Sequence, residues 1–330
     1  MKLKKHFWVG MSALSMMFST VAHANDDTLG AFLEQNFPAI HAADTSDDPI
    51  RAFANQLPQQ NVAFQPAVSN APFNTYGASS YAYGPLLNAQ SALIMNANTG
   101  KVLYQKNMDS VRSIASISKL MSAMVLLDAN LNMNEPITIT EAEIDRLKGT
   151  GSRLSIGTTL TRGELLHISL MSSENRATHA LGRTYPGGMG AFVAAMNAKA
   201  QSLGMNSTRF YEPTGLDPRN VSTARDLSVM VRAASNYATI RSLSTSNYGS
   251  VYTSNGRLQS YKNTNSLVRE GVWDITLQKT GYIREAGRSM VVQANLDNQP
   301  MIIVVLGAST TSNRVSDAHR LSSVIRQTPL

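Results

Sequence analysis

Three short elements of the sequence carry residue types that together could form and break an acyl bond. Ser116-Ile-Ser-Lys119 is the only Ser-x-x-Lys in the chain. It is followed by the only Ser-x-Asn, Ser173-Glu-Asn175, and by the only Lys-Thr-Gly, Lys279-Thr-Gly281. A serine hydroxyl becomes a nucleophile when a neighbouring base takes its proton. The three elements in this order predict a serine acyl-enzyme in which a lysine is that base.

The spacing inside the first element has a mechanical reason. Positions three apart share one face of a helix, so Lys119 can lie beside Ser116. The residues from Ile117 to Asp128 are mostly apolar with a helical rhythm, which predicts that Ser116 stands at a helix N-terminus. There the backbone N–H groups and the helix dipole favour developing negative charge. Burial and a second cation both lower a lysine pKa, and we expect Lys279 to be that cation.

Each element alone is weak evidence. A Ser-x-x-Lys is typical of a capped, solvated helix start, Ser and Asn gather in turns, and Lys-Thr-Gly is often a turn as well. Three single-copy elements in order, each in a suitable local context, favour catalysis over these alternatives. We expect each of them at the rim of one cleft.

Further stretches of the sequence extend the pattern beyond the three elements. They are Ala115-Ser-Ile-Ser-Lys-Leu-Met-Ser-Ala123, Tyr185-Pro-Gly-Gly188, Phe192-Val-Ala-Ala-Met-Asn-Ala-Lys-Ala200, Leu203-Gly-Met205, Pro213-Thr-Gly-Leu-Asp217 and Ser222-Thr-Ala-Arg-Asp-Leu227. With them the chain resembles the D-alanyl-D-alanine peptidases, the low-molecular-mass penicillin-binding proteins. Within that family it is similar to the penicillin-binding protein 7 type endopeptidases. The resemblance covers roughly residues 91–327.

The resemblance implies an α+β fold of the penicillin-binding protein transpeptidase and β-lactamase type. An antiparallel sheet is flanked by helices, and a helical cluster is inserted between its early and late strands. The sequence pattern is compatible: it predicts strands over 92–96, 102–104, 274–280, 289–294 and 301–306. It predicts helices over 161–170 and 315–325 and from about residues 176, 189 and 223.

The resemblance also implies catalytic roles. Ser116 would attack a D-alanyl carbonyl and form an acyl-enzyme, which water then hydrolyses. Lys119 would take the Ser116 proton. Ser173 would relay a proton to the leaving amine, and Asn175 would hydrogen-bond both the substrate and Lys119.

Substrate-binding roles follow from the third element and its neighbours. Lys279 and Thr280 would receive the substrate carboxylate, and Gly281 would let a substrate strand approach the backbone. The N–H of Tyr282 would complete the oxyanion hole together with the N–H of the nucleophile. Arg314 matches a family arginine that assists with the carboxylate, and a solvated arginine at a helix start is the alternative.

Peptidoglycan stem peptides and their cross-links are the implied substrates, with β-lactams as covalent inhibitors. The Glu in Ser173-Glu-Asn175 departs from the glycine common in the carboxypeptidase branch. This favours a DD-endopeptidase that cuts the cross-link between D-alanine and meso-diaminopimelate. The alternative is a DD-carboxypeptidase that removes the terminal D-alanine.

Two rival classes share parts of the pattern. A class A β-lactamase needs a Glu-x-x-x-Asn, but the candidate glutamate Glu212 is followed four residues on by Leu216. The other rival is a catalytically silent penicillin-binding or wall-binding regulatory protein. Intact Ser116, Lys119 and Lys279 argue against it, because a binder has no need of a desolvated lysine beside a serine.

Composition excludes several chemistries. The chain of 330 residues has no cysteine, which excludes a disulfide scaffold, a cysteine nucleophile and a zinc–thiolate site. Its six histidines form no His-Glu-x-x-His pair, and there is no Gly-x-Ser-x-Gly. We therefore expect no metal and no cofactor, and no nucleic-acid partner.

The N-terminal part of the sequence predicts export. Residues 1–24 combine a basic start, a short apolar run and Ala22-His-Ala24, which is typical of a cleavable signal peptide. Its removal lowers Lys+Arg from 29 to 26 against 22 acidic residues, a net charge of about +4. Residues 25–85, rich in Asn, Gln, Ala, Pro and Ser, are expected to be flexible and mostly disordered. Residues 86–330 would form the catalytic domain.

We expect the mature protein in a periplasm. The sequence after Gly281 is too short for the second β-rich domain and the amphipathic helix that larger carboxypeptidases of the family append. At most loose membrane association is therefore expected.

Overall fold

The computed structural model describes residues 84–327 of the chain. The predicted signal peptide and nearly all of the predicted flexible segment lie outside these residues. At the centre is a five-stranded antiparallel sheet with strand order β2-β1-β11-β10-β9. Its strands are β1 (Ser91–Asn96), β2 (Val102–Lys106), β9 (Asp274–Ile283), β10 (Gly287–Leu296) and β11 (Gln299–Ala308). Early and late strands thus share one sheet, so the α+β class predicted from the sequence is confirmed.

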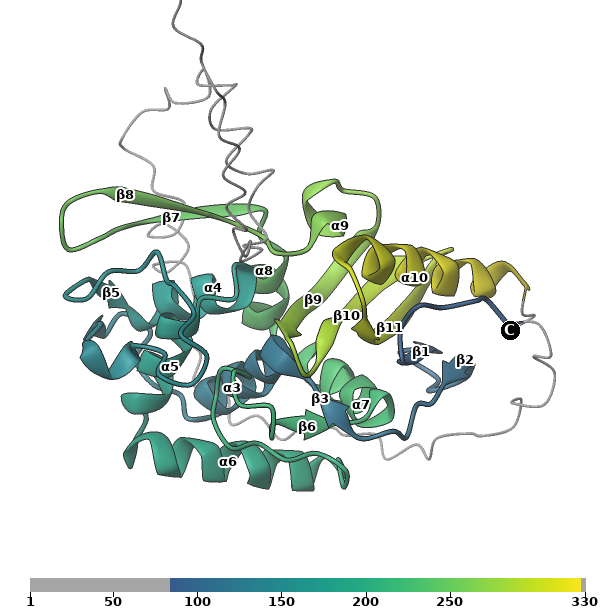
Figure 1. Cartoon of the computed structure of the whole chain (residues 1–330), viewed down its shortest axis with the longest axis horizontal. Helices are drawn as coiled ribbons and strands as arrows, with labels where there is room; N and C mark the ends of the chain where they lie inside the picture. Colours follow the sequence, from purple (N-terminus) through teal and green to yellow (C-terminus); the bar gives the residue numbers. More distant parts are fainter. Residues whose placement is uncertain (1–83, 328–330) are drawn as a thin grey trace, which may run out of the picture. The chain divides into compact units, whose positions relative to one another are not determined.

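The central strand β11 is buried on both faces. From Met301 to Leu306 every residue is apolar, and successive side chains enter two different cores because a strand alternates its faces. Met301, Ile303 and Val305 pack with α10 (Thr311–Ser323) and the 3₁₀ turn η4 (Val324–Gln327). The residues between them face the helices on the other side. The sheet is therefore the middle of three layers (Figure 1).

The inserted helices form the larger layer (Figure 1). They are α3 (Ser118–Asp128), α4 (Arg162–Met171), α5 (Asn175–Arg183), α6 (Gly188–Ser202), α7 (Ala224–Ala234) and α8 (Ala238–Thr245). In α3 the residues from Ser118 to Leu126 are all buried, as in a helix surrounded by other elements. The starts of α4 and α7 are set by the side chains of Thr161 and Thr223, which accept hydrogen bonds from backbone N–H groups of the first turn.

Short elements connect these layers. Three two-stranded pairs are β3 (Arg112–Ser113) with β6 (Val221–Ser222), β4 (Pro136–Thr138) with β5 (Thr159–Thr161), and β7 (Tyr248–Tyr252) with β8 (Leu258–Lys262). The short helices are η2 (Ala115–Ile117), η3 (Glu141–Glu143) and α9 (Ser266–Arg269). The sequence pattern had not predicted α8 or the β7–β8 hairpin.

The first described residues are tied down before β1 begins. The buried carboxylate of Asp317 on α10 accepts hydrogen bonds from the backbone N–H groups of Asn88 (3.1 Å) and Ala89 (2.6 Å). Lys106 Nζ on β2 donates to the carbonyls of Leu87 (2.9 Å) and Ala89 (2.6 Å). The chain therefore enters the sheet along its β2 edge. Among residues 84–327, no helix combines the length and the apolar character needed to cross a membrane.

Candidate active site

Ser116 lies in η2, two residues before α3 begins at Ser118, so the predicted helix-start position is confirmed. Lys119 is on the first turn of α3 and is completely buried. Its Nζ donates a hydrogen bond to Ser116 Oγ over 3.0 Å. Ala115, just before the serine, has a φ of 48°, a conformation that non-glycine residues rarely adopt. Such backbone strain persists where the surrounding structure enforces it.

Lys119 Nζ has two further acceptors. It donates to Asn175 Oδ1 over 2.8 Å and to the backbone carbonyl of Thr214 over 2.7 Å. Burial lowers the pKa of Lys119 to about 8, against the opposing charges of Glu212 and Glu174. The amine is thus fixed beside the hydroxyl with a pKa that makes its neutral form accessible near physiological pH.

The turn that supplies the Thr214 carbonyl was missed as a site element in the sequence analysis. Gly215 has a φ of 86°, and a Cβ placed on it would lie 1.9 Å from the carbonyl oxygen of Ala115. The Glu212 carboxylate holds the turn by accepting from the backbone N–H groups of Thr214 (2.6 Å) and Gly215 (2.5 Å). The glycine within the family-like stretch 213–217 was the available signal, because only glycine fits so close an approach.

The Lys-Thr-Gly element lies on β9, the edge strand of the sheet. We call its residues 279–282, with Arg314 of α10, the strand wall. Lys279 is completely buried, and its Nζ donates to the carbonyl of Thr280 over 3.0 Å. Burial, together with the charges of Lys119 and Arg314, holds the pKa of Lys279 well below its usual value. No carboxylate among the described residues pairs with Lys279.

Two statements of the sequence analysis need correction: that Lys279 lowers the pKa of Lys119, and the alternative that Arg314 is solvated. Burial lowers the pKa of Lys119. The repulsion between the two lysines instead adds to burial in lowering the pKa of Lys279. Arg314 is only 6% exposed, so the solvated alternative is wrong. The interior position follows from α10 packing on the sheet, which the local sequence does not reveal.

Gly281 lets the strand wall approach the nucleophile. A Cβ on Gly281 would lie 2.9 Å from the backbone nitrogen of Ser116 and 3.1 Å from Ala115 Cβ. Any side chain there would push β9 away from η2. Tyr282 follows with a half-exposed ring, over which the guanidinium of Arg288 lies at 3.8 Å from the ring centroid.

The Ser-Glu-Asn element forms part of the opposite side of the cleft. Ser173 has a φ of 62°, and within residues 84–327 its hydroxyl makes no hydrogen bond to Ser116 or Lys119. Glu174 caps α5 by accepting from the N–H of Arg176 and also accepts from Ser152 Oγ over 2.7 Å. The structure thus joins Ser116 and Asn175 through hydrogen bonds from Lys119 Nζ, and Ser173 is two residues before Asn175 in the chain.

A loop after η3 completes this side. The Asp145 carboxylate accepts from the N–H groups of Leu147 (2.8 Å), Lys148 (3.0 Å) and Thr150 (2.9 Å), which folds the loop upon itself. We call residues 142–152, 173–175 and 212–217 together the loop wall. Lys148 Nζ reaches across to Glu285, at the turn between β9 and β10, over 2.5 Å. One ion pair therefore joins the loop wall to the turn that follows the strand wall on β9.

No group of three or more His, Asp or Glu side chains in the described part of the chain is arranged to hold a metal ion. The chemistry that the described residues can perform is acyl transfer: a nucleophilic hydroxyl, a buried amine beside it and a cationic strand facing both.

Comparison with known proteins agrees with this arrangement. A family model described as D-alanyl-D-alanine carboxypeptidase matches residues 79–310. The chain belongs to this family of serine peptidases.

Relatives within the family include the D-alanyl-D-alanine endopeptidases of Escherichia coli and Pseudomonas aeruginosa. Each is 44% identical to this chain; the matches cover 75% and 71% of the chain and 80% and 76% of the relatives. Among solved structures, a Streptomyces DD-transpeptidase superposes with a TM-score of 0.69 at 29% identity, covering 74% of this chain and 99% of that one. This serine DD-peptidase therefore has the penicillin-binding protein transpeptidase fold predicted from its sequence.

Proposed function

We propose that this serine DD-peptidase is an endopeptidase that hydrolyses the D-alanyl to meso-diaminopimelyl cross-links of peptidoglycan through an acyl-enzyme on Ser116. The observation that carries the acyl-enzyme is the 3.0 Å contact between Ser116 Oγ and the buried amine of Lys119. The cross-link preference is supported by the two 44% identical relatives, which are named endopeptidases.

The first half of the reaction begins with neutral Lys119. The Ser116 hydroxyl donates its proton to Nζ while Oγ attacks the D-alanyl carbonyl carbon. The N–H groups of Ser116 and Tyr282 stabilise the negative oxygen of the tetrahedral intermediate. The close approach of β9 to η2 that Gly281 permits supports this pairing, because a Cβ on Gly281 would lie 2.9 Å from the Ser116 nitrogen.

The second half releases the amine and then the acid. Ser173 relays the proton to the leaving nitrogen as the C–N bond breaks, and Asn175 keeps Lys119 aligned through their 2.8 Å hydrogen bond. Water then attacks the ester carbon, and Ser116 recovers its proton. A penicillin would stop at the ester stage and remain as a covalent inhibitor.

The strand wall would receive the carboxylate of the amino acid being released. Lys279 and Arg314 are buried cations, and Lys279 has no carboxylate partner among the described residues. An entering carboxylate would relieve their repulsion and form charge-assisted hydrogen bonds with Lys279 and Thr280. In a cross-link the same carboxylate belongs to the D-centre of meso-diaminopimelate, so one cleft serves both stem trimming and cross-link cleavage.

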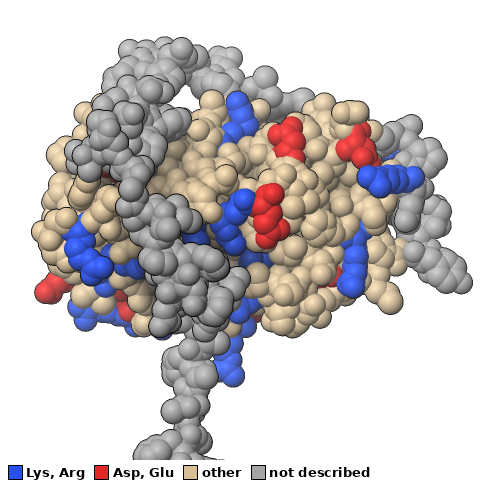
Figure 2. All heavy atoms as spheres, turned by 90° about the horizontal axis from the view of Figure 1, so that it is seen from above, with Lys and Arg blue, Asp and Glu red and all other residues tan. Residues whose placement is uncertain are grey.

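We further propose that the protein acts in the periplasm after removal of residues 1–24, with at most loose membrane association. On the face seen in Figure 2, Lys and Arg side chains are dispersed, with Asp and Glu among them, rather than gathered in one patch. That face therefore has no single strongly charged patch that would attract the peptidoglycan polymer, and recognition would be concentrated in the cleft.

The test is chromatography of purified muropeptides after digestion. We expect cross-linked dimers to become monomers faster than pentapeptides lose their terminal D-alanine. Trimming of pentapeptides with dimers left intact would assign the chain to carboxypeptidase activity, which the description of the family model also names. Ser116→Ala should abolish both activities and covalent labelling by fluorescent penicillin while the protein stays folded; labelling of this variant would refute the nucleophile.

A further inference from the structure

A pocket of about 420 Å³ opens from the loop wall beside the catalytic amine. Its inner lining includes Asn175 and Thr214, the two residues whose oxygens accept hydrogen bonds from Lys119. The remaining lining comes from the segment 142–147, from His179 on α5 and from the turn at 212–216. No residue of the strand wall contributes. The pocket is therefore lined by other residues than those of the proposed carboxylate site.

Part of the pocket lining is apolar and unusually exposed. Leu147 is 56% exposed and Ile144 is 38% exposed, although both side chains are hydrophobic. Leu216 lies in the same lining. Such surfaces suit the methylene groups of a ligand, because contact with them removes apolar area from water.

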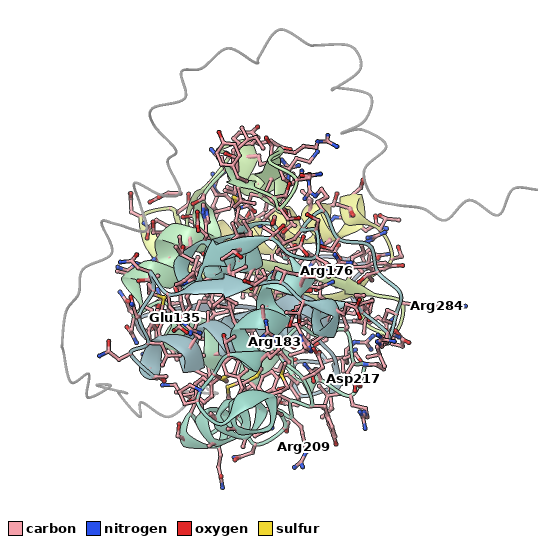
Figure 3. All side chains as sticks on the ribbon, turned by 90° about the vertical axis from the view of Figure 1, so that its left-hand side faces the viewer. Glu135, Arg176, Arg183, Arg209, Asp217 and Arg284 are labelled. Atoms are coloured by element: carbon pink, nitrogen blue, oxygen red, sulfur yellow. The ribbon has the colours of Figure 1, made fainter. Side chains whose placement is uncertain are left out.

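His179 gives the pocket a hydrogen-bond acceptor. Its Nδ1 lies 3.1 Å from Glu143 Oε1, and Arg183 Nε donates to the same oxygen over 2.7 Å; Arg183 is labelled in Figure 3. Although burial opposes it, the hydrogen bonds from His179, Arg183 and Thr140 lower the pKa of Glu143 to about 2, so this carboxylate is ionised. In a neutral imidazole, a carboxylate at Nδ1 places the proton there, and Nε2 is then an acceptor.

Charges of both signs surround this acceptor. The carboxylates of Asp145 and Glu212 line the pocket, and backbone N–H groups saturate their oxygens, so they contribute a fixed negative field. Arg146 also lines the pocket, is exposed, and has no hydrogen bond or ion pair with any residue in 84–327. The pocket thus combines an apolar lining, an acceptor in a negative field and one uncommitted cation.

We propose that this pocket binds the side chain of the diamino acid that precedes the attacked D-alanine in the donor stem. Its methylenes contact Leu147 and Leu216, its terminal ammonium donates to His179 Nε2, and its terminal carboxylate pairs with Arg146. The assignment rests on the proposed function. The assignment adds to that function a site that recognises the stem on the acyl side of the scissile bond.

The test uses soluble stems that end in D-alanyl-D-alanine and differ only at the preceding residue: meso-diaminopimelate, its carboxamide at the distal carboxyl group, L-lysine or L-alanine. We expect kcat/KM of the wild type to fall in that order. Arg146→Gln should lower kcat/KM for the diaminopimelyl stem about fivefold to tenfold more than for the carboxamide or lysyl stem, because only the first offers a free carboxylate. His179→Ala should reduce the difference in kcat/KM between the lysyl and alanyl stems.

Arg284→Gln is the matched control, because Arg284 is also an exposed arginine but belongs to the turn between β9 and β10, at the edge of the molecule in Figure 3. It should leave the ranking of the stems unchanged. Equal kcat/KM for all four stems, or an equal loss on all of them in Arg146→Gln, overturns the pocket assignment while the DD-peptidase activity stands. Failure of the wild type to cleave any of the stems or muropeptide dimers overturns the proposed function as well.

Discussion

The strand wall and the loop wall of the cleft hold their charged groups in different ways. On the strand wall, Lys279 is buried without a carboxylate partner among the described residues, and burial together with the neighbouring cations depresses its pKa. On the loop wall, the carboxylates of Glu212 and Asp145 are saturated by N–H groups of their own turns. The strand wall thus offers a cation without a carboxylate partner to an anionic ligand, whereas the carboxylates of the loop wall stabilise the backbone of their own turns. Substitutions on the two walls should therefore have different effects on activity and on the free energy of unfolding.

The largest effect is expected at Lys119, which stands between the walls. Because it must be neutral to accept the Ser116 proton, Lys119→Arg should slow acylation by penicillin by about 10²–10⁴-fold. In the wild type the acylation rate should rise with pH and level off above the Lys119 pKa of about 8. Stopped-flow labelling with fluorescent penicillin between pH 6 and 9.5 measures both. A rate that is flat across this range would rule out Lys119 as the base.

The next largest effect concerns the turn beneath the nucleophile. Gly215→Ala places a Cβ 1.9 Å from the Ala115 carbonyl oxygen, so it should reduce the free energy of unfolding by about 3 kcal/mol or more and slow acylation. Gly204→Ala is the matched control, because Gly204 has a φ of 74° and open space around it. It should cost only about 1 kcal/mol. Equal losses of stability in urea unfolding would show that the close contact at Gly215 has no special weight.

Lys279 offers the sharpest contrast between the walls. Lys279→Met removes a buried, unpaired cation and should raise the free energy of unfolding by about 1–3 kcal/mol while lowering kcat/KM for stem peptides. Because the folded-state pKa of Lys279 is depressed, its stability cost is largest below that pKa. The cost fades as pH rises toward the unfolded value near 10.5, so the gain should fade too. Glu212→Gln should instead reduce stability. If both variants shift the melting temperature in the same direction, the contrast fails.

The ion pair between Lys148 and Glu285 should give the smallest effect. Both side chains are partly exposed, so Glu285→Gln should change the free energy of unfolding by less than about 1 kcal/mol, and less at high salt. The hydrogen bond from Lys148 lowers the pKa of Glu285, so the contribution is present above the usual glutamate pKa and is lost as pH falls through the folded value. A measured loss above 2 kcal/mol would mean that the walls are locked together.

The site residues that act through their side chains could be predicted from the sequence, whereas those that act through backbone groups could not. Ser116, Lys119 and Asn175 were recognisable because their side chains act and their spacing is local or repeated in a family. Thr214 was not, since it acts through a carbonyl that every residue possesses. Glu212 was considered only as a failed β-lactamase glutamate, although its carboxylate organises that turn.

The regular elements show the same division. The strands of the sheet were predicted because long apolar runs such as Met301 to Leu306 are unambiguous. The β7–β8 hairpin was not predicted because Val251 and Tyr261 are its only large buried apolar side chains, and its remaining residues are mostly polar or exposed. The burial of Arg314 was unreadable for a further reason: it depends on how α10 packs on the sheet, not on the residues around it.

The fastening of Asn88 and Ala89 to Asp317 has a consequence for orientation. The chain enters the sheet at the β2 edge, where Gly84 lies against Tyr104, whereas the cleft is built on β9 at the opposite edge. Four strand spacings of roughly 4.8 Å each separate the two edges, about 19 Å in all. A support or carrier coupled ahead of Gly84 would therefore be joined to the edge remote from the cleft. Attachment close to Gly84 should therefore leave the cleft accessible to an insoluble polymer.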